Sequence, residues 1–320
     1  MSSKSNDQGR AFEMACMIAL GEKIVQHRKY EKVVFEKNSS FEAATRSWNN
    51  LDDEFHHTIL KAASAMADKL VKLEPMMVES DDEIIVLKLQ KDEEGEKGDV
   101  RDILIVRGES GWEIGLSVKH NHFAVKHSRL SSSIDFGDKW YGIPCSLNYW
   151  KVVNPIFAFL LEEKKKRTKW SDLPDKEHTV YLPLLSAFMD EIKVANQVDP
   201  FFPKRMVEYL LGKYDFYKVI SVDSKKTTNI QAFNLRGTLN QSSRTRDPEI
   251  IIPVAELPDE LVAVKMKRNT NTTVELYLNN GWQFSFRIHS ASTYVENSLK
   301  FDIQFTGMPT EIVLIACQWR

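Results

Sequence analysis

Two short segments joined by a glycine-rich turn constrain the fold of this chain more than any other feature. Residues 101–106 begin with Arg-Asp and continue as an apolar run, whereas residues 112–119 alternate between apolar and polar side chains. Between them lies Gly-Glu-Ser-Gly, and glycine-rich clusters between apolar runs are typical of reversals of the chain. The pattern predicts a β-hairpin in which every second residue of the second strand faces a core.

Charged residues stand at the two free ends of this hairpin. Asp102 opens the first strand and Lys119 closes the second. Because the start of one antiparallel strand lies opposite the end of the next, these side chains are expected to be neighbours. A carboxylate beside an ammonium can bind a divalent metal next to a phosphate and position a water that attacks it. The alternative is a half-buried hairpin with a solvated polar face, which is common in proteins.

The composition is that of an ordinary globular chain and limits the alternatives. The chain has 320 residues and a formal net charge of −2, so binding to nucleic acid would need a basic cleft balanced by acidic surface elsewhere. Its three cysteines lie far apart, which is typical of free thiols in a reducing compartment and gives no zinc spacing. The longest apolar runs are shorter than about 18 residues and the N-terminus is polar, which predicts a cytoplasmic protein without a membrane span.

The hairpin resembles the core of the PD-(D/E)XK nucleases, here represented by Asp102 and the triplet Ser117-Val118-Lys119. Residues 112–130, the N-terminal QGRAFE and the C-terminal GWQFSFRIHSASTYVENSLKFDIQ are similar to the HaeIII-type restriction endonucleases. The resemblance implies a mixed α/β fold: a restriction-endonuclease-like core with a mixed central sheet flanked by helices, and a β-rich C-terminal region.

One position departs from the family pattern, because the residue two before the lysine is Ser117 where an acid is usual. Glu113 lies six residues before Lys119, roughly 20 Å along a strand, and Asp99 is a weak candidate in the approach to the hairpin. Glu13 borders the apolar stripe of a helix predicted over residues 8–26, which is the usual place of a rim residue reaching water. By resemblance to nucleases whose first-helix glutamate faces the metal, Glu13 would supply the missing carboxylate.

The resemblance implies a type II restriction endonuclease that hydrolyses double-stranded DNA with Mg²⁺. Asp102, Glu13 and the backbone carbonyl of Val118 would be metal ligands. Lys119 would orient the attacking water and offset charge on the phosphoryl oxygens, and Ser117 would hold a metal-bound water. The family specificity would be GGCC, cut to blunt ends, and a cognate cytosine methyltransferase would protect the cell's own DNA. A symmetric homodimer would cut both strands in one event, and a monomer by successive nicking.

Two segments carry side chains suited to DNA. The first follows Lys119 directly, and a solvated helix end is its alternative explanation; the second is a strand candidate over residues 282–289, whose polar face is also what any half-exposed sheet shows. Arginine suits guanine edges and glutamine suits adenine edges. The predicted DNA contacts are His120, Asn121, His122, Lys126, His127, Ser128, Arg129, Gln283, Ser285, Arg287 and His289.

Hydrophobic periodicity divides the chain into three predicted regions: a catalytic core over residues 1–150, a helical region over 151–215 and a β-rich, DNA-recognising region over 216–320. Within the core, a capping box predicts Ser39 as the N-cap of a helix.

Two other functions stay open. One is a structure-selective PD-(D/E)XK repair nuclease, and the other is a DNA-binding protein without catalysis, which the serine at position 117 supports. Strand candidates are residues 83–90, 216–222, 229–235, 261–267, 273–278, 282–289 and 299–305.

Overall fold

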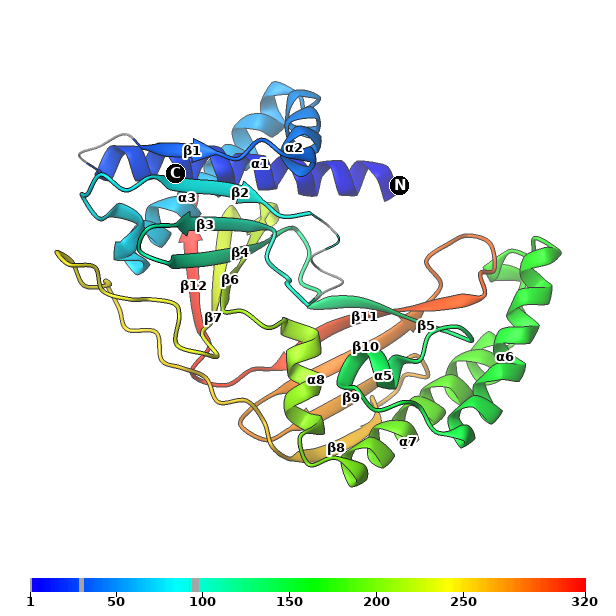
Figure 1. The fold of residues 1–320 in the computed structure, drawn as a ribbon. Coiled ribbons are helices and arrows are strands. Elements are labelled where there is room, and N and C mark those ends of the chain that lie inside the picture. Colours follow the sequence, from blue (N-terminus) through cyan, green and yellow to red (C-terminus); the bar gives the residue numbers. More distant parts are fainter. Residues whose placement is uncertain (1, 29–31, 92, 94–97) are drawn as a thin grey trace. The chain divides into compact units, whose positions relative to one another are not determined.

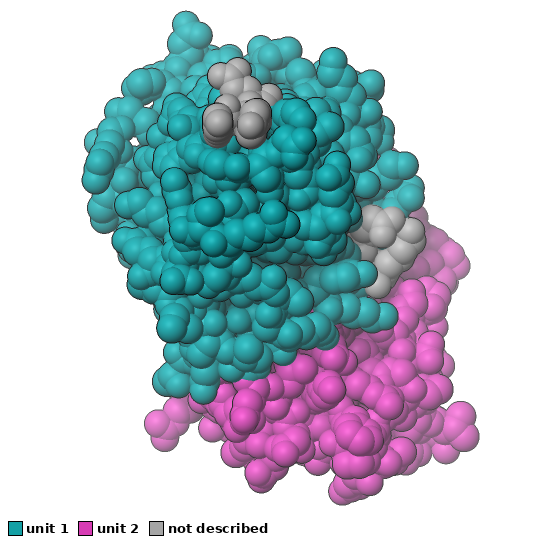
Figure 2. All heavy atoms as spheres, turned by 60° about the vertical axis from the view of Figure 1, so that its left-hand side comes forward, with its two compact units in different colours: residues 1–123, 213–255, 310–320 teal, residues 124–212, 256–309 magenta. Residues whose placement is uncertain are grey.

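The computed structural model describes residues 2–28, 32–91, 93 and 98–320. The chain forms two compact units, each assembled from segments that are far apart in the sequence (Figure 2). Unit 1 comprises residues 1–123, 213–255 and 310–320, and unit 2 comprises residues 124–212 and 256–309. Among the described residues, no helix is both long enough and apolar enough to cross a membrane.

Unit 1 is built on a seven-stranded mixed sheet with the order β1-β2-β3-β4-β6-β7-β12 (Figure 1). β1 pairs in parallel with β2 and β4 pairs in parallel with β6, whereas the other neighbours are antiparallel. A parallel neighbour needs a long crossover, and the chain between β4 and β6 includes much of unit 2. The strands are β1 (Val33–Phe35), β2 (Ile85–Leu89), β3 (Ile103–Arg107), β4 (Trp112–His120), β6 (Phe216–Val222), β7 (Thr227–Phe233) and β12 (Val313–Gln318).

The helices of unit 1 bury their apolar stripes against this sheet. Phe12 and Leu20 of the first helix and Leu70 of the third are fully buried in one core with the strands.

The N-cap of the second helix is Asn38, whose side chain accepts a hydrogen bond from the Phe41 amide at 3.0 Å, so the predicted Ser39 cap is wrong by one residue. Asparagine and serine cap equally well, which is why adjacent candidates are hard to separate. The helical elements are α1 (Ser2–His27), α2 (Ser39–Asn49), α3 (Asp53–Leu73), and the 3₁₀ turns η1 (Pro75–Val78) and η4 (Asp223–Lys225).

The predicted hairpin is confirmed as β3 and β4, joined by a turn over residues 108–111. The antiparallel register pairs Ile103 with Leu116 and Arg107 with Trp112. The apolar side chains of β4 belong to the core of unit 1, as the alternation predicted. This register places the start of β3 beside the end of β4, where the predicted catalytic residues lie.

Unit 2 is built on a five-stranded antiparallel sheet with the order β5-β11-β10-β9-β8. Along β10, Phe284, Phe286 and Ile288 are buried and the intervening polar residues are not, so the predicted two-faced strand is confirmed. The strands are β5 (Lys126–Ser131), β8 (Leu261–Met266), β9 (Thr273–Leu278), β10 (Gln283–His289) and β11 (Ser298–Gly307).

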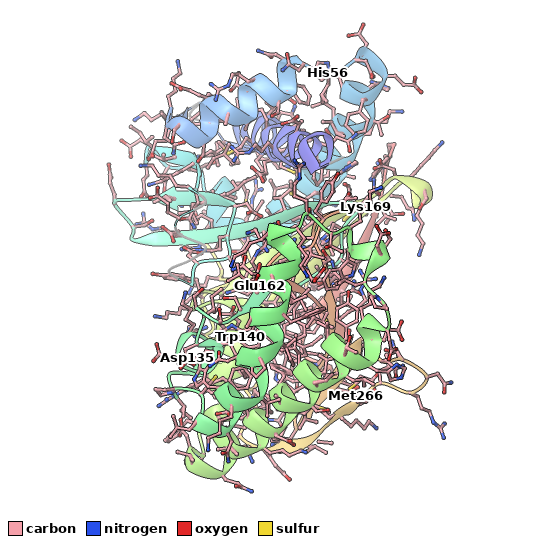
Figure 3. All side chains as sticks on the ribbon, turned by 90° about the vertical axis from the view of Figure 1, so that its right-hand side faces the viewer. His56, Asp135, Trp140, Glu162, Lys169 and Met266 are labelled. Carbon is pink, nitrogen blue, oxygen red and sulfur yellow. The ribbon has the colours of Figure 1, made fainter. Side chains whose placement is uncertain are left out.

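Aromatic side chains join the apolar face of this sheet to the helices of unit 2. Trp140, labelled in Figure 3, stacks on Tyr209 at 5.0 Å between ring centroids, and Phe188 contacts both Phe286 and Phe301. Such ring pairs add to the stabilisation that apolar burial gives. The helical elements are α5 (Phe136–Tyr141), α6 (Leu147–Lys165), α7 (Leu182–Val198), α8 (Phe202–Leu211), the 3₁₀ turn η2 (Trp170–Asp172) and the π-helical turn η3 (Glu177–Tyr181).

The division of the chain differs from the three predicted regions 1–150, 151–215 and 216–320. β6 and β7 extend the sheet that contains β4, and β12 adds its far edge, so strands predicted to form a DNA-recognising region belong to unit 1. β5, in contrast, pairs with β11 in unit 2. Local patterns identify strands but carry no information about which distant strand will be the partner.

Candidate active site

Asp102 lies immediately before β3, and its carboxylate is bound by three donors from the end of β4. Its Oδ2 accepts hydrogen bonds from the Lys119 ammonium at 2.9 Å, the Val118 amide at 2.6 Å and the Ser117 hydroxyl at 3.3 Å. The Asp102 amide donates to the Leu116 carbonyl at 2.7 Å, which continues the hairpin pairing to this residue. The structure therefore brings together the aspartate, serine, valine and lysine that the sequence singled out.

Lys119 is a partly exposed cation held by negative charge. Its side chain is 32 % exposed and that of Asp102 is 26 % exposed, so the pair is open to solvent on one side. Burial alone would lower the pKa of Lys119, but the charge and hydrogen bond of Asp102 and the charge of Glu13 outweigh it and raise the pKa. Lys119 is therefore a stable donor and positive charge at neutral pH.

Glu13, half-buried on α1, shares the electrostatic environment of Asp102 and Lys119. Besides raising the pKa of Lys119, its charge adds to burial and to the charge of Asp102 in raising the pKa of the Cys16 thiol. α1 packs against β4, and the ring of Phe12, the residue before Glu13, lies 6.1 Å from the His120 ring at the end of that strand. The sequence interpretation placed Glu13 here by resemblance alone, and the geometry is compatible with it.

The two other acids considered at the sequence level are engaged elsewhere. Arg101 binds Asp99 and Glu113, each at 2.7 Å from a guanidinium nitrogen. The Arg101 side chain crosses Gly115, where an added Cβ would stand 2.0 Å from the arginine Cδ, so a larger residue at this position of β4 would force Arg101 to move. Glu113 and Asp99 thus form an ion-pair cluster with Arg101, which leaves Glu13 as the better candidate for a second carboxylate.

Lys218, which the sequence interpretation missed, is a further ammonium at this site. It lies on β6 as the register partner of Ser117, and its side chain is buried, with Nζ donating to the Phe123 carbonyl at 3.1 Å. Burial, reinforced by the charge of Lys119 and opposed by that of Asp102, lowers the pKa of Lys218 to about 7. The available signal was a lone charged residue inside the otherwise uncharged strand FYKVISV.

The residues that follow Lys119 anchor the end of β4. His120 Nε2 lies 2.9 Å from the Asp223 carboxylate, and the Asn121 side chain both donates to that carboxylate at 2.9 Å and accepts from the Asp223 amide at 3.0 Å. The edge of the Phe55 ring packs against the His120 ring at 5.5 Å between centroids. His122 is exposed. His120 and Asn121 therefore have a structural role in addition to the predicted contact with DNA.

In unit 2, the predicted DNA-contacting residues of β5 divide between its two faces. His127 and Arg129 are exposed, as predicted for DNA contacts. Ser128 is buried and shares a 2.7 Å hydrogen bond with the Tyr209 hydroxyl, and Lys126 donates to the Tyr209 carbonyl at 2.8 Å. Strand alternation turns Lys126 and Ser128 toward Tyr209 of α8, on the side of β5 opposite to His127 and Arg129. Their contact with DNA stays a prediction.

The polar residues of β10 lie on the face of the unit 2 sheet opposite its apolar core. Arg287 is exposed, and Gln283, Ser285 and His289 are partly exposed. Arg287 contacts the Asp302 carboxylate at 3.4 Å from the neighbouring strand β11. All four predicted side chains of β10 are thus accessible.

The oxygen donors of unit 1 suit a hard divalent cation. All three hydrogen bonds to Asp102 end on Oδ2, so Oδ1 lies outside this set and can bind a metal. Asp102 with Glu13 would give two carboxylates, the ligand type that Mg²⁺ uses together with water. The donor set therefore fits the metal that the resemblance implies.

A mixed sheet covered by helices, with an aspartate before one strand and a lysine near the end of the next, is consistent with a restriction-endonuclease fold. The HaeIII restriction endonuclease family matches residues 9–309 of the chain. The type II restriction enzyme HaeIII of Haemophilus aegyptius is 50 % identical over 321 residues, covering 100 % of both proteins. No solved structure gives a significant match. The chain belongs to the HaeIII restriction endonuclease family and is a type II restriction enzyme, a site-specific deoxyribonuclease.

Proposed function

We propose that this enzyme cuts double-stranded DNA at GGCC to blunt ends, with Mg²⁺ bound at Asp102 and Glu13. The observation that carries the catalytic part is the contact between Asp102 Oδ2 and Lys119 Nζ at the end of two paired strands. The specificity is supported by the 50 % identity to HaeIII over the full length of both chains.

Lys119 would act on the scissile phosphate directly. Its raised pKa keeps it protonated, so it would orient the attacking water by donating to it and offset the charge that develops on the phosphoryl oxygens. Asp102 holds the ammonium in place at 2.9 Å. Ser117 would position a water, because its hydroxyl can accept as well as donate.

The metal would be held by the carboxylates of Asp102 and Glu13 and by the carbonyl of Val118. A bound Mg²⁺ supplies Lewis-acid polarisation of the phosphate and lowers the pKa of a water. Val118 lies between Ser117 and Lys119, and its amide donates to Asp102, which ties the backbone of this segment to the carboxylate. Because Ser117 occupies a position that is usually acidic in these nucleases, Glu13 would provide the second negative charge at the metal.

Recognition of the bases would use the polar face of the unit 2 sheet. Across three neighbouring strands, Asp302 of β11 is the register partner of both His127 of β5 and Arg287 of β10. In the next row, Lys300 of β11 is the register partner of Arg129 of β5. His289 completes that second row. Guanidinium and imidazole donors suit the acceptors of guanine in the major groove.

Two further partners follow from the proposal. A cognate cytosine methyltransferase would be needed in the same cell, because an unmodified GGCC site would be cut. A symmetric homodimer would cut both strands of the palindrome in one event. Cleavage of supercoiled plasmid without a nicked intermediate would support the dimer, whereas accumulation of nicked circles would support successive cuts.

Digestion of unmethylated plasmid DNA with and without Mg²⁺ tests the catalytic proposal. Wild type should give discrete fragments whose sequenced ends are blunt and lie within GGCC. Lys119→Ala should abolish cleavage, and Lys193→Ala, which removes an exposed lysine of α7, should not. Cleavage that persists in Lys119→Ala would show that the catalytic centre lies elsewhere, and ends outside GGCC would overturn the specificity.

A further inference from the structure

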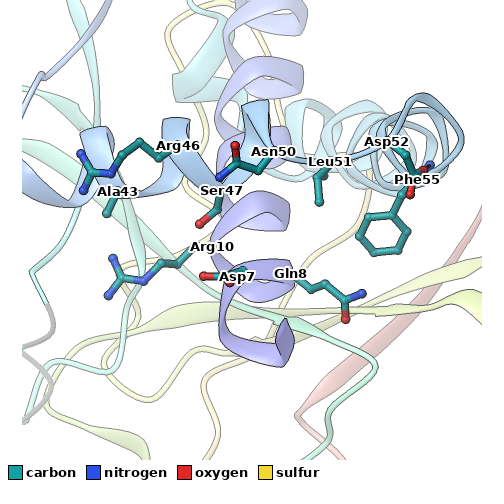
Figure 4. Close-up of a pocket in the computed structure, with 10 residues that line it drawn as sticks. All are labelled: Asp7, Gln8, Arg10, Ala43, Arg46, Ser47, Asn50, Leu51, Asp52 and Phe55. Atoms are coloured by element: carbon teal, nitrogen blue, oxygen red, sulfur yellow. Dashed lines mark hydrogen bonds between the residues drawn. The ribbon is translucent and has the colours of Figure 1, made fainter. Parts of the chain in front are cut away.

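A groove of about 700 Å³ lies in unit 1 between the N-terminal part of α1, the end of α2 and the start of α3 (Figure 4). Figure 4 shows the side chains of Arg10 and Arg46 extending toward one end of this groove, and Gln8 and Phe55 toward the other. None of the roles discussed above uses it. The lining residues are Asp7, Gln8, Arg10, Ala43, Arg46, Ser47, Asn50, Leu51, Asp52 and Phe55.

The short connection between α2 and α3 shapes the groove. Asp52 caps α3 by accepting a hydrogen bond from the Phe55 amide at 2.8 Å, so this carboxylate is engaged in the helix start. Ser47 is buried on the inner side of α2, whereas Arg46 beside it is exposed. The polar wall thus combines two guanidinium groups with the amides of Gln8 and Asn50, and the carboxylate of Asp7 lines it as well. Guanidinium and amide groups are donors suited to phosphate and sugar oxygens.

The groove is next to the catalytic residues of the same unit. Arg10 precedes Glu13 by three residues on α1, so both side chains lie on one side of that helix. Phe55, at the other end of the groove, packs edge-on against His120, the residue directly after Lys119. A DNA strand whose scissile phosphate is at Lys119 would therefore meet this groove within a few nucleotides.

We propose that this groove binds the sugar-phosphate backbone of the substrate DNA outside the scissile phosphate. Arg10 and Arg46 pair with backbone phosphates, and Phe55 contacts the sugar. This inference rests on the proposed function, since it takes DNA as the ligand and Lys119 as the cleavage point. Backbone contacts of this kind set affinity and register without reading sequence.

The test measures DNA binding in the Lys119→Ala background without Mg²⁺, so that cleavage does not interfere. Fluorescence anisotropy is recorded with a GGCC duplex and with a scrambled duplex over a range of salt concentrations. The double variant Arg10→Gln/Arg46→Gln should weaken binding of both duplexes about 10-fold or more, and should reduce the salt slope by about two, one for each lost phosphate contact. Arg10→Gln/Arg46→Lys should bind both duplexes more tightly than the double glutamine variant, because it retains the charge at position 46.

Arg320→Gln is the matched control, because it removes an exposed guanidinium of the same unit that lies outside the groove. It should leave affinity and salt slope unchanged, and circular dichroism should show that each variant is folded. Unchanged binding and slope in the folded double variant would overturn the groove proposal while leaving the proposed function intact. Weakened binding by the double variant, together with cleavage that persists in Lys119→Ala, would support the groove as a DNA-binding site and overturn the proposed catalytic centre.

Discussion

Lys218 of β6 is the register partner of Ser117 of β4, so a buried ammonium lies beside the one active-site position that departs from the nuclease pattern. An acid at position 117 would face this lysine and could neutralise it. With serine in that place, the ammonium is bound by the Phe123 carbonyl, and its burial costs stability. Because its pKa is lowered to about 7, Lys218 is charged only part of the time at neutral pH, and this charge near Asp102 costs folding free energy.

Lys218→Met is expected to stabilise the fold, most strongly at low pH. The pKa of Lys218 falls from 10.5 when exposed to about 7 in the folded chain, a difference equivalent to about 5 kcal/mol. Below pH 7 the lysine is charged in both states and the full cost applies; above pH 10.5 it is neutral in both and the cost vanishes. Urea unfolding at pH 6 and pH 9 measures this. An equal difference between variant and wild type at both pH values would contradict it.

Glu13→Gln should raise the Mg²⁺ concentration needed for half-maximal cleavage about 10-fold or more. The amide keeps the size of the side chain but removes the negative charge that would attract the metal. Glu22→Gln, on an exposed position of the same helix, is the control and should behave as wild type. An unchanged Mg²⁺ requirement in Glu13→Gln would show that another group compensates for Ser117.

Glu74 should make the fold less stable as the pH rises through neutrality. It is fully buried and bonded to the Tyr217 hydroxyl and the Asn240 amide, each at 2.6 Å, yet burial raises its pKa from 4.5 to about 7. Stability is complete below pH 4.5, where the acid is neutral in both states, and about 3 kcal/mol is lost as the pH rises through 7. Glu74→Gln should flatten this dependence in denaturant unfolding between pH 5 and pH 8. A slope equal to that of wild type would exclude Glu74 as its source.

Arg287→Ala should relax sequence discrimination by about 1–3 kcal/mol if this exposed guanidinium reads a guanine. Cleavage rates on GGCC and on duplexes with one changed base pair give the measure. Arg268→Ala, which removes an exposed arginine from the turn between β8 and β9, is the control. A parallel loss on all duplexes would instead identify Arg287 as a backbone contact.

Much of the site was predictable because it is local. Asp102 and Lys119 are joined by one tight turn, and antiparallel pairing across such a turn determines which ends meet. The strands at residues 216–222 and 273–278 were found with their observed bounds, since strong alternation or continuous apolar runs identify strands well. Side-chain alternation in β10 was predicted for the same reason.

Other features required contacts between distant segments. Lys218 reaches Ser117 only because β6 pairs in parallel with β4 after a crossover of nearly 100 residues. β5 appeared to be a basic segment of unassigned structure, and only its pairing with β11 decides that His127 and Arg129 are exposed while Ser128 is buried.

The sequence by itself determined the catalytic hairpin, the position of its charged ends and the family resemblance, because these depend on residues near one another in the chain. The tertiary structure decided which strands complete the sheet, which lysine lies beside Ser117, and that two discontinuous units share the chain. Strand partners are selected by the burial of whole apolar faces and the pairing of every backbone group, and these are sums over the entire fold that no short segment contains.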